Sequence, residues 1–222
     1  MAMRDRTELR KHLESGLPVL IYDFDGREEE TDMVFFAGSV TWKSVNVLRK
    51  EAGGLICYVT SEQVGRRIGL TFFTDLVRER YPNLYKRPTY GDEPAFSLWV
   101  NHVGTRTGIS DEDRAKTIKE LHDVVELAEE GKEESARRKF HSEFYSPGHV
   151  PILLSRGVSK RRGHTELTVA LLELLGLPRS GVIAEMLDDG RSMNKEKVVL
   201  YAKNNGIPLI EGKELLKEVG AL

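Results

Sequence analysis

The sequence predicts one domain of mixed α/β or α+β class, extending over residues 1–222. Short apolar runs alternate with helical patterns from one end of the chain to the other, which is typical of a sheet packed against helices. Hydrophobic residues make up 40% and charged residues 31% of the chain, the balance of a soluble globular protein. We find no internal repeat, low-complexity tract or linker that would mark a second domain.

Composition and charge exclude several classes of function. The 33 basic and 35 acidic residues give a formal charge of −2, which does not suit a strongly basic nucleic-acid-binding protein. A single cysteine excludes an intramolecular disulfide framework and a cysteine-rich zinc site. No apolar run reaches the roughly 18 residues of a membrane span. The charged, helix-like residues 1–16 contain no apolar signal region, so we expect a cytoplasmic protein without a membrane partner.

The first half of the chain predicts three strands and a helix. Two apolar runs, 18–22 and 33–37, predict buried strands on either side of a charged loop, which they would hold on a rigid base. Residues 41–52 predict a helix that ends at a glycine pair, where a positive φ costs little. Residues 55–59 are rich in β-branched and aromatic side chains and predict a third strand. Three prolines interrupt residues 81–94, which we interpret as a long loop.

The second half of the chain continues this alternation. Ser110 and Asp113 form a variant of the capping box, and they precede a helix whose apolar residues recur at helical spacing until Gly131. The remaining expected elements are the strands 96–103, 182–186 and 209–210 and the helices 164–175 and 195–205. A glycine follows each of those two helices, as expected for a helix C-terminus.

Residues 23–32 form an acidic loop with six carboxylates in ten residues: Asp23, Asp25, Glu28, Glu29, Glu30 and Asp32. Carboxylates this close repel one another and raise each other's pKa values, unless solvent, an arginine or a divalent cation relieves the repulsion. A solvated acidic turn is the simplest interpretation. The two flanking strands favour a binding site instead, as does Arg27, whose planar guanidinium suits an anionic or hydroxylated ligand.

Residues 156–165 form a basic turn that leads directly into the helix expected at 164–175. Backbone N–H groups, the helix dipole and arginine charge would meet there, so the turn suits a phosphate group. A solvated basic loop is the alternative, and the net charge and the lack of interleaved aromatic residues disfavour nucleic-acid binding. His164 follows Gly163 at the point where a phosphate and a metal ion would meet.

Other polar residues stand in positions that suit either a site or ordinary structure. A Pro-Gly-His-Val-Pro turn would present His149 at the start of a strand. Cys57 lies in an apolar strand and is expected to be a small buried residue. Glu185 is the lone acid of its apolar run, either on an exposed face or in a site that raises its pKa. Thr107 and Ser110 lie near glycines, where hydroxyls bind phosphate or cap a helix.

Six segments occur in a recognisable order. They are Asp23 with Gly-Arg-Glu-Glu-Glu-Thr-Asp at 26–32, Gly-Gly-Leu-Ile-Cys at 53–57, Thr-Gly-Ile-Ser-x-x-Asp-Arg at 107–114, Pro-Gly-His-Val at 147–150, Arg-x-Gly-His-Thr-Glu at 161–166, and Glu185. This set resembles the 3,4-dihydroxy-2-butanone 4-phosphate synthases of riboflavin biosynthesis. The chain departs from that pattern at Gly26, where aspartate is usual, and at Thr31, where glycine or alanine is usual. The resemblance implies a single α+β domain, a mixed sheet covered by helices, in the monofunctional form.

The resemblance also implies an activity. Such a lyase converts D-ribulose 5-phosphate to L-3,4-dihydroxy-2-butanone 4-phosphate and formate by enolisation, dehydration and skeletal rearrangement. It would use two Mg²⁺ ions per site, replaceable by Mn²⁺, and no organic cofactor, and it would be a homodimer with the site near the subunit interface. Two alternatives stay open: another metal-dependent sugar-phosphate lyase or isomerase, and a catalytically silent homologue that binds a phosphorylated ligand.

The same resemblance assigns roles to individual residues, and the chemistry needs both a cation that stabilises oxyanions and several proton carriers. The implied metal ligands are Glu28 and His164. The implied catalytic residues are Glu185, Asp32, Glu30 and His149, with Glu185 as a key proton carrier and Asp32 as its complement. The implied substrate-binding residues are Asp23, Arg27, Cys57, Thr107, Ser110, Arg161 and Thr165, with the phosphate on Arg161 and Thr165.

Overall fold

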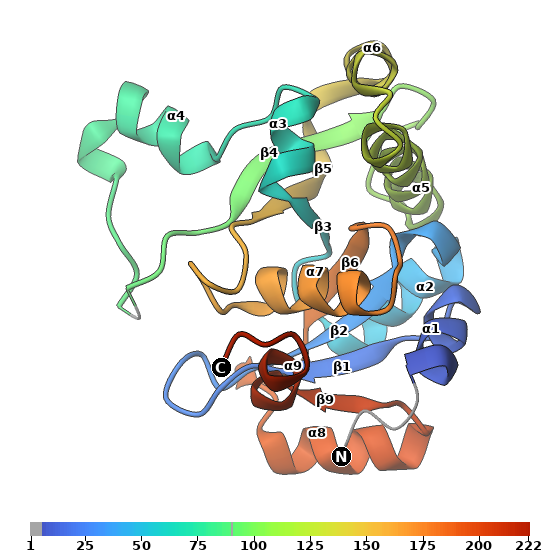
Figure 1. The fold of residues 1–222 in the computed structure, drawn as a ribbon, viewed down its shortest axis with the longest axis vertical. Helices are drawn as coiled ribbons and strands as arrows, with labels where there is room; N and C mark the ends of the chain where they lie inside the picture. The colour runs from blue at the N-terminus through green and yellow to red at the C-terminus, as the bar shows by residue number, and fades with distance from the viewer. Residues whose placement is uncertain (1–5, 90) are drawn as a thin grey trace.

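A mixed seven-stranded sheet forms the centre of the computed structural model, which describes residues 6–89 and 91–222 (Figure 1). The strands follow the order β4-β5-β3-β6-β2-β1-β9. Their bounds are β1 Val19–Tyr22, β2 Thr31–Phe36, β3 Cys57–Ser61, β4 Phe96–His102, β5 Phe144–Ser155, β6 Gly181–Glu185 and β9 Leu209–Glu211. The short strands β7 (Leu187–Asp188) and β8 (Arg191–Ser192) form a separate hairpin. The expected α+β fold with a mixed sheet is confirmed.

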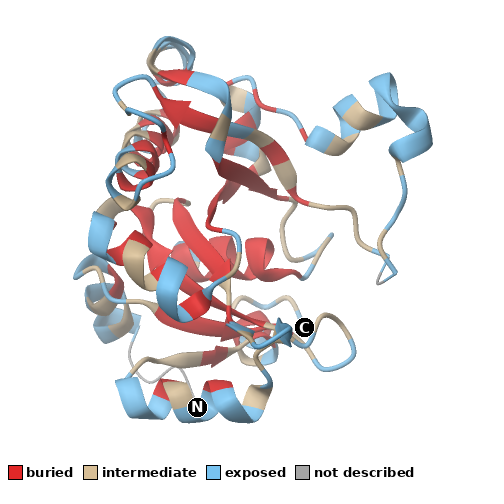
Figure 2. Cartoon of the chain, turned by 180° about the vertical axis from the view of Figure 1, so that it is seen from behind, coloured by how far each residue is buried: buried red, intermediate tan, exposed pale blue. Residues whose placement is uncertain are grey.

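Helices cover both faces of the sheet. The α-helices are α1 Arg6–Glu14, α2 Trp42–Val47, α3 Glu62–Arg67, α4 Phe73–Arg80, α5 Asp111–Glu129, α6 Glu133–Glu143, α7 His164–Leu174, α8 Lys195–Asn205 and α9 Gly212–Glu218. Short turns of other helix types are η1 Ala37–Ser39, η2 Leu48–Ala52 and η3 Pro82–Leu84. One core contains residues of α2, α3, α5, α6 and α8, and the other contains residues of α1, α7 and α9. Figure 2 shows the buried sheet between these layers.

Burial on both faces explains why the first two strands read as continuous apolar runs. In β1, Leu20 packs into the core beneath α2 and α5, whereas Val19 and Ile21 pack into the core beneath α7. In β2, Phe35 and Val34 divide between the two cores in the same way. A strand with helices on both sides has no solvent-facing side chain, so alternation of polar and apolar residues disappears.

The expected turn at 147–151 is wrong, because these residues lie within the long strand β5. The pairing of β4 with β5 shifts register between Val100 and Asn101, which marks an irregularity in the ladder. At that point Gly148 lies against the β4 backbone, where a side-chain Cβ would come within 2.0 Å of the Val100 carbonyl carbon. The strand therefore continues past its proline and glycine as an irregular strand rather than as a separate turn.

Other differences from the sequence prediction lie at the ends and in the polar segments. The helices α3, α4, α6 and α9 are additions to the elements that the sequence predicted. The helix 41–52 is present, but its second half is the π-type turn η2, which ends at Gly53 with a φ of 93°. Residues 1–5 of the N-terminal segment and residue 90 of the expected loop at 81–94 lie outside the described residues. Among the described helices, none has the length and apolarity needed to cross a bilayer.

The sheet order brings several predicted site residues together. Asp23 follows β1 directly, and β1 pairs antiparallel with β2, which contains Asp32. On the other side of β2, Asp32 lies opposite Glu185 of β6. Strand β3 pairs with β6 so that Cys57 lies opposite Ile183. Four adjacent strands thus contribute the first part of a site at one end of the sheet.

Candidate active site

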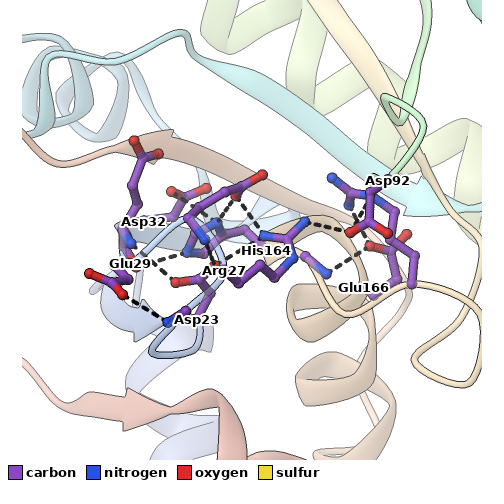
Figure 3. A network of polar contacts seen from close by, with 12 residues as sticks. Asp23, Arg27, Glu29, Asp32, Asp92, His164 and Glu166 are labelled. Atoms are coloured by element: carbon purple, nitrogen blue, oxygen red, sulfur yellow. Dashed lines mark hydrogen bonds and ion pairs between the residues drawn. The ribbon is translucent and has the colours of Figure 1, made fainter. Parts of the chain in front are cut away.

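The acidic loop is held by Asp23, whose carboxylate is buried at the end of β1 (Figure 3). This carboxylate accepts the backbone N–H groups of Glu28 at 3.2 Å and Glu30 at 3.1 Å. It also accepts a hydrogen bond from Arg27 Nη1 at 3.0 Å. Gly26 adopts a φ of 81°, a left-handed conformation that costs glycine little. The loop is therefore a defined structure rather than a solvated acidic turn.

Arg27 joins the acidic loop to a segment far away in the sequence. Its Nη1 lies 2.7 Å from Glu28 Oε2, and its Nη2 donates to Asp92 Oδ2 at 3.0 Å. Burial alone would lower the pKa of Arg27, but the carboxylates of Glu28, Asp92 and Asp23 outweigh burial and raise it. The guanidinium therefore stays charged and spans the acidic loop and the segment before β4.

His164 stands at the first position of α7 and faces the acidic loop. Its Nε2 lies 3.2 Å from the carbonyl oxygen of Glu30, which accepts hydrogen bonds but cannot donate them. The other ring nitrogen, Nδ1, lies 3.6 Å from Glu28 Oε2 and 3.6 Å from Asp32 Oδ1. A backbone carbonyl therefore fixes the ring, with Nδ1 directed at two carboxylates.

Burial and charge move the pKa values of these three side chains in different directions. Burial alone would raise the pKa of Glu28, but hydrogen bonding to His164 and the charge of Arg27 lower it to about 2. Burial would lower the pKa of His164, but Asp32, Glu28 and Asp23 outweigh burial and raise it to about 9. Burial raises the pKa of Asp32 to about 7 against the opposing charge of His164. Without a bound cation, the imidazole acts as the positive partner of the carboxylates.

The donor set fits a divalent cation. Asp23, Glu28 and His164 each offer one ligand atom, and these atoms lie within 4.8 Å of one another. Within the part of the chain that the structure describes, Asp32 Oδ1 is buried and has no hydrogen-bond partner. Carboxylate oxygens and an imidazole nitrogen whose other nitrogen is fixed by a carbonyl are suitable ligands for such an ion. Since Asp23 already holds the loop backbone, Glu28 and His164 are the ligands most available to it.

A positively charged region lies at the start of α7, next to the proposed cation position. It consists of the guanidinium groups of Arg27 and Arg161 together with Gly163, and we call it the anion site. Glu166 holds Arg161 from behind, with Arg161 Nη1 2.5 Å from Glu166 Oε2. A Cβ on Gly163 would lie 2.3 Å from Arg161 Nη1 and 2.8 Å from Arg27 Nη2. Glycine thus lets both arginines approach the N-terminus of the helix, where the dipole also favours an anion. Thr165 is buried in the same first turn.

Glu185, Glu30 and Cys57 lie near Asp32: besides burial, the charges of Glu185 and Glu30 raise the pKa of Asp32, and the charge of Asp32 raises the pKa of Cys57. Glu185 Oε2 accepts the backbone N–H of Leu55 at 2.9 Å, which fixes the carboxylate beside the start of β3. Cys57 is buried, and burial together with the charges of Glu185 and Asp32 raises the pKa of its thiol. The thiol is therefore protonated, which suits a residue that shapes the site rather than a nucleophile. The Glu30 carboxylate accepts a hydrogen bond from the Ser192 hydroxyl.

Thr107, Ser110 and His149 belong to a different cluster, built around Asn101 of β4 and Asp113 of α5, with Gly108 between these two side chains. Asn101 Oδ1 accepts the His149 N–H at 2.8 Å, and Asn101 Nδ2 lies 3.1 Å from His149 Nδ1. Asp113 accepts the N–H of Thr107 at 3.1 Å, and Ser110 caps α5 by accepting the N–H of Asp113 at 3.0 Å. Among the described residues, no recorded polar contact joins this cluster to the acidic loop. In Figure 1 the turn after β4 lies beside α5 and α6, at the opposite end of the molecule from the loop between β1 and β2.

The structure adds site residues that sequence reasoning missed. The Asp92 carboxylate accepts a hydrogen bond from Arg27 and lies 3.9 Å from Arg161 Nε. Nothing in the sequence indicated this role, because Asp92 belongs to the proline-interrupted segment 81–94, which was expected to be a long loop. Glu166 belongs to a segment that the sequence analysis singled out, but its role as the partner of Arg161 had no signal. Asn101 organises the second cluster from a strand that was expected only for its apolar composition.

A further group of possible metal ligands, His102, Glu120 and Glu143, has a simpler explanation. The ammonium group of Lys139 lies 2.7 Å from Glu120 and 2.6 Å from Glu143, so a cation of the chain itself occupies this place. The Nδ1 of His102 accepts the N–H of Gly104, which leaves the proton on the nitrogen that faces Glu143. This group is an ion-pair network at the surface of α5 and α6.

Comparison with known proteins identifies a family over nearly the whole chain. The family model for 3,4-dihydroxy-2-butanone 4-phosphate synthase matches residues 7–218. The synthase of Archaeoglobus fulgidus is 40% identical over 225 residues, with 96% of this chain and 93% of that protein covered. The synthase of Methanosarcina acetivorans is 39% identical over 218 residues, with 92% of this chain and 87% of that protein covered.

Solved structures agree with this result at the level of the fold. The Candida albicans synthase superposes with a TM-score of 0.70 at 26% identity, covering 96% of this chain and 95% of that one. A 3,4-dihydroxy-2-butanone 4-phosphate synthase in complex with two magnesium ions superposes with a TM-score of 0.73 at 24% identity, covering 96% and 94%. The chain therefore belongs to the 3,4-dihydroxy-2-butanone 4-phosphate synthase family, whose members are enzymes of riboflavin biosynthesis.

Proposed function

We propose that this site converts D-ribulose 5-phosphate to L-3,4-dihydroxy-2-butanone 4-phosphate and formate. The observation that carries the proposal is the junction at the start of α7. There His164 faces the carboxylates of Glu28 and Asp32, and Arg161, only three residues earlier, belongs to the anion site. A phosphorylated sugar that binds with its phosphate on the anion site would extend its hydroxyl and carbonyl groups toward the carboxylates. The substrate is a water-soluble sugar phosphate, which supports a cytoplasmic location.

Glu28 and His164 would hold a divalent cation, with Mg²⁺ as our first choice and Mn²⁺ as a substitute. When bound, the cation supplies Lewis-acid stabilisation of the oxygen atoms that gain negative charge. A 3,4-dihydroxy-2-butanone 4-phosphate synthase of similar fold is in complex with two magnesium ions, which supports the two-ion site that we propose here. Glu28 also forms an ion pair with Arg27, whose Nη1 lies 2.7 Å from Glu28 Oε2. This ion pair connects the proposed cation position to the anion site.

Asp32 and Glu185 are the proposed proton carriers. They lie opposite each other on paired strands, so both carboxyl groups are positioned by the sheet rather than by a mobile loop. Asp32 Oδ1 has no hydrogen-bond partner among the described residues, and Glu185 is held by a single backbone N–H of Leu55 at one of its oxygens. Each carboxyl group therefore keeps an oxygen that could accept or donate a proton at the substrate.

A homodimer would complete the site. The cluster of Thr107, Ser110 and His149 contains three of the residues that the resemblance assigned to the site, yet it lies at the far edge of the sheet from the acidic loop. A twofold-symmetric dimer could bring this cluster of one copy next to the acidic loop of the other copy. We therefore include the shared site in the proposal.

The first test is formate release. The purified chain, incubated with D-ribulose 5-phosphate and Mg²⁺, is expected to release formate, and EDTA is expected to stop the release because it removes the cation. Folding is monitored in the same samples by circular dichroism. Consumption of the sugar phosphate without formate would indicate another lyase or isomerase, and binding without turnover would indicate a silent homologue.

Replacing Glu28 with glutamine should lower kcat at least about 100-fold, because loss of an anionic ligand removes several kcal/mol of electrostatic stabilisation. Formate release is the measurement, and Mg²⁺ titration should show weaker binding. Glu29→Gln is the matched control, since Glu29 is exposed and its side chain accepts a hydrogen bond from the backbone N–H of Gly26. Full activity of Glu28→Gln would exclude its role as a metal ligand.

Replacing Arg161 with alanine should raise KM for D-ribulose 5-phosphate by at least tenfold, because a charge-assisted bond to the phosphate contributes to ground-state binding. Arg162→Ala is the matched control, since Arg162 is exposed and its Nη2 donates a hydrogen bond to the carbonyl oxygen of Ala221. The thermal midpoint should be measured for both variants, because Arg161 also pairs with the buried Glu166. An unchanged KM would place the phosphate elsewhere.

Subunit complementation tests the shared site. Glu28→Gln and His149→Ala are each expected to be inactive, but a mixture that is unfolded and refolded together should recover about a quarter of wild-type activity. The reason is that half of the dimers are mixed, and each mixed dimer has one site with both residues intact. A mixture with no more activity than its components would show that both residues serve the site from one chain.

A further inference from the structure

The anion site contains a carboxylate of the chain itself. Asp92 Oδ2 accepts a hydrogen bond from Arg27 Nη2 at 3.0 Å and lies 3.9 Å from Arg161 Nε. Figure 3 shows Asp92 beside these guanidinium groups at the start of α7, on the opposite side of Arg27 from Asp23. The Asp92 side chain is about one-third exposed, whereas the Arg161 side chain is nine-tenths buried. A partly exposed acid thus reaches into a buried pair of arginines.

The anion site also has bonding capacity that Asp92 does not use. Arg161 Nε is buried and has no hydrogen-bond partner in residues 6–89 and 91–222, because Asp92 stays 3.9 Å away. The Nη1 of the same guanidinium donates to Glu166, and this hydrogen bond fixes the orientation of the Nε–H group. A carboxylate has two oxygens in one plane, whereas a phosphate has three terminal oxygens in a tetrahedral arrangement and carries about −1.5 to −2 charges at neutral pH. A phosphate therefore suits the site better than the aspartate that occupies it.

The segment next to Asp92 is anchored independently of the anion site. The Glu93 carboxylate lies 2.9 Å from Arg78 Nη2 and 3.5 Å from Arg156 Nη2. Arg156 Nη1 also donates to the carbonyl oxygens of Glu93 and Pro94. Because these contacts hold the chain just beyond Asp92, the aspartate can leave the arginines by a local movement while the segment stays attached.

These contacts point to competition. We propose that Asp92 is an internal substitute for the substrate phosphate. The Asp92 carboxylate occupies the anion site in the free enzyme and must be displaced when the phosphate binds. The inference rests on the proposed function, since it takes the anion site as the phosphate site. An aspartate and a phosphate bound to the same two arginines would repel each other, so the two states exclude one another.

Such a substitute sets the affinity of the site. The apparent affinity for an anion falls by the fraction of molecules in which the site is open, so an internal competitor weakens binding of every anion that enters. The same penalty applies to inorganic phosphate and to the substrate, because both must displace Asp92 before they bind. A substrate whose other groups reach the acidic loop gains additional binding that offsets the penalty, whereas inorganic phosphate does not. Asp92 would therefore keep the affinity for free phosphate low without changing the ratio of the two affinities.

The experiment measures binding of inorganic phosphate by isothermal titration calorimetry at low ionic strength, together with KM for D-ribulose 5-phosphate. Asp92→Asn should bind phosphate about three- to tenfold more tightly than the wild type and should lower KM in the same direction, because it removes the competing charge. Asp92→Glu retains the charge and should restore an affinity near that of the wild type. Glu79→Gln is the charge-matched control on α4, because Glu79 is exposed and pairs with Arg80.

Each outcome decides one question. Unchanged or weaker phosphate binding by Asp92→Asn overturns the proposal and shows that Asp92 supports the arginines instead of competing for them. An equal gain in Glu79→Gln also overturns it, since the effect would then be one of overall charge. Arg161→Ala distinguishes failure of the competition from failure of the proposed phosphate site. If Arg161→Ala loses phosphate binding while Asp92→Asn is unchanged, the phosphate site stands and the competition fails; if Arg161→Ala binds phosphate normally, the proposed phosphate site itself fails.

Discussion

The buried carboxylate of Asp23 is the interaction on which the rest of the site depends. Two backbone N–H groups and one guanidinium converge on it, and together they fix the path of the loop from β1 to β2. Loss of this carboxylate would leave its buried donors without an acceptor, and an unsatisfied buried donor costs more free energy than a typical hydrogen bond contributes. The positions of Glu28, Arg27 and the Glu30 carbonyl all follow from this one anchor. Through that carbonyl, the anchor also orients the imidazole of His164.

The charge of the site is balanced across two regions rather than within one. The acidic loop alone would be strongly repulsive, yet Arg27 and His164 place positive groups against its carboxylates and hold the pKa of Glu28 at about 2. The basic turn alone would repel itself in the same way, and Glu166 and Asp92 place negative groups against Arg161. Each region therefore supplies part of the counter-charge for the other, and α7 connects them because His164 and Glu166 belong to the same first turn.

The sequence predicted those parts of the structure that local patterns determine. The apolar runs of β1, β2 and β6 and the capped start of α5 are local, and the acidic loop and basic turn were recognised from their composition. The pairing of Arg27 with Asp92 was not predictable, because the two residues are 65 positions apart and neither stands in a periodic pattern. The strand β5 was missed for a related reason, since its proline and glycine are typical of a turn until the neighbouring β4 backbone is present to pack against them.

The glycine pair at 53–54 shows how one short pattern serves both the fold and the site. Gly53 has a φ of 93° and ends the turn η2, which is the role that the sequence predicted for the pair. Gly54 has a different constraint, because a Cβ there would lie 2.2 Å from Glu185 Oε2 and 2.6 Å from the Glu185 backbone nitrogen. Without a side chain, residue 54 lets Glu185 reach the N–H of Leu55 and accept it at 2.9 Å. The end of a helix and the orientation of a proposed proton carrier thus depend on adjacent glycines for separate reasons, one conformational and one steric.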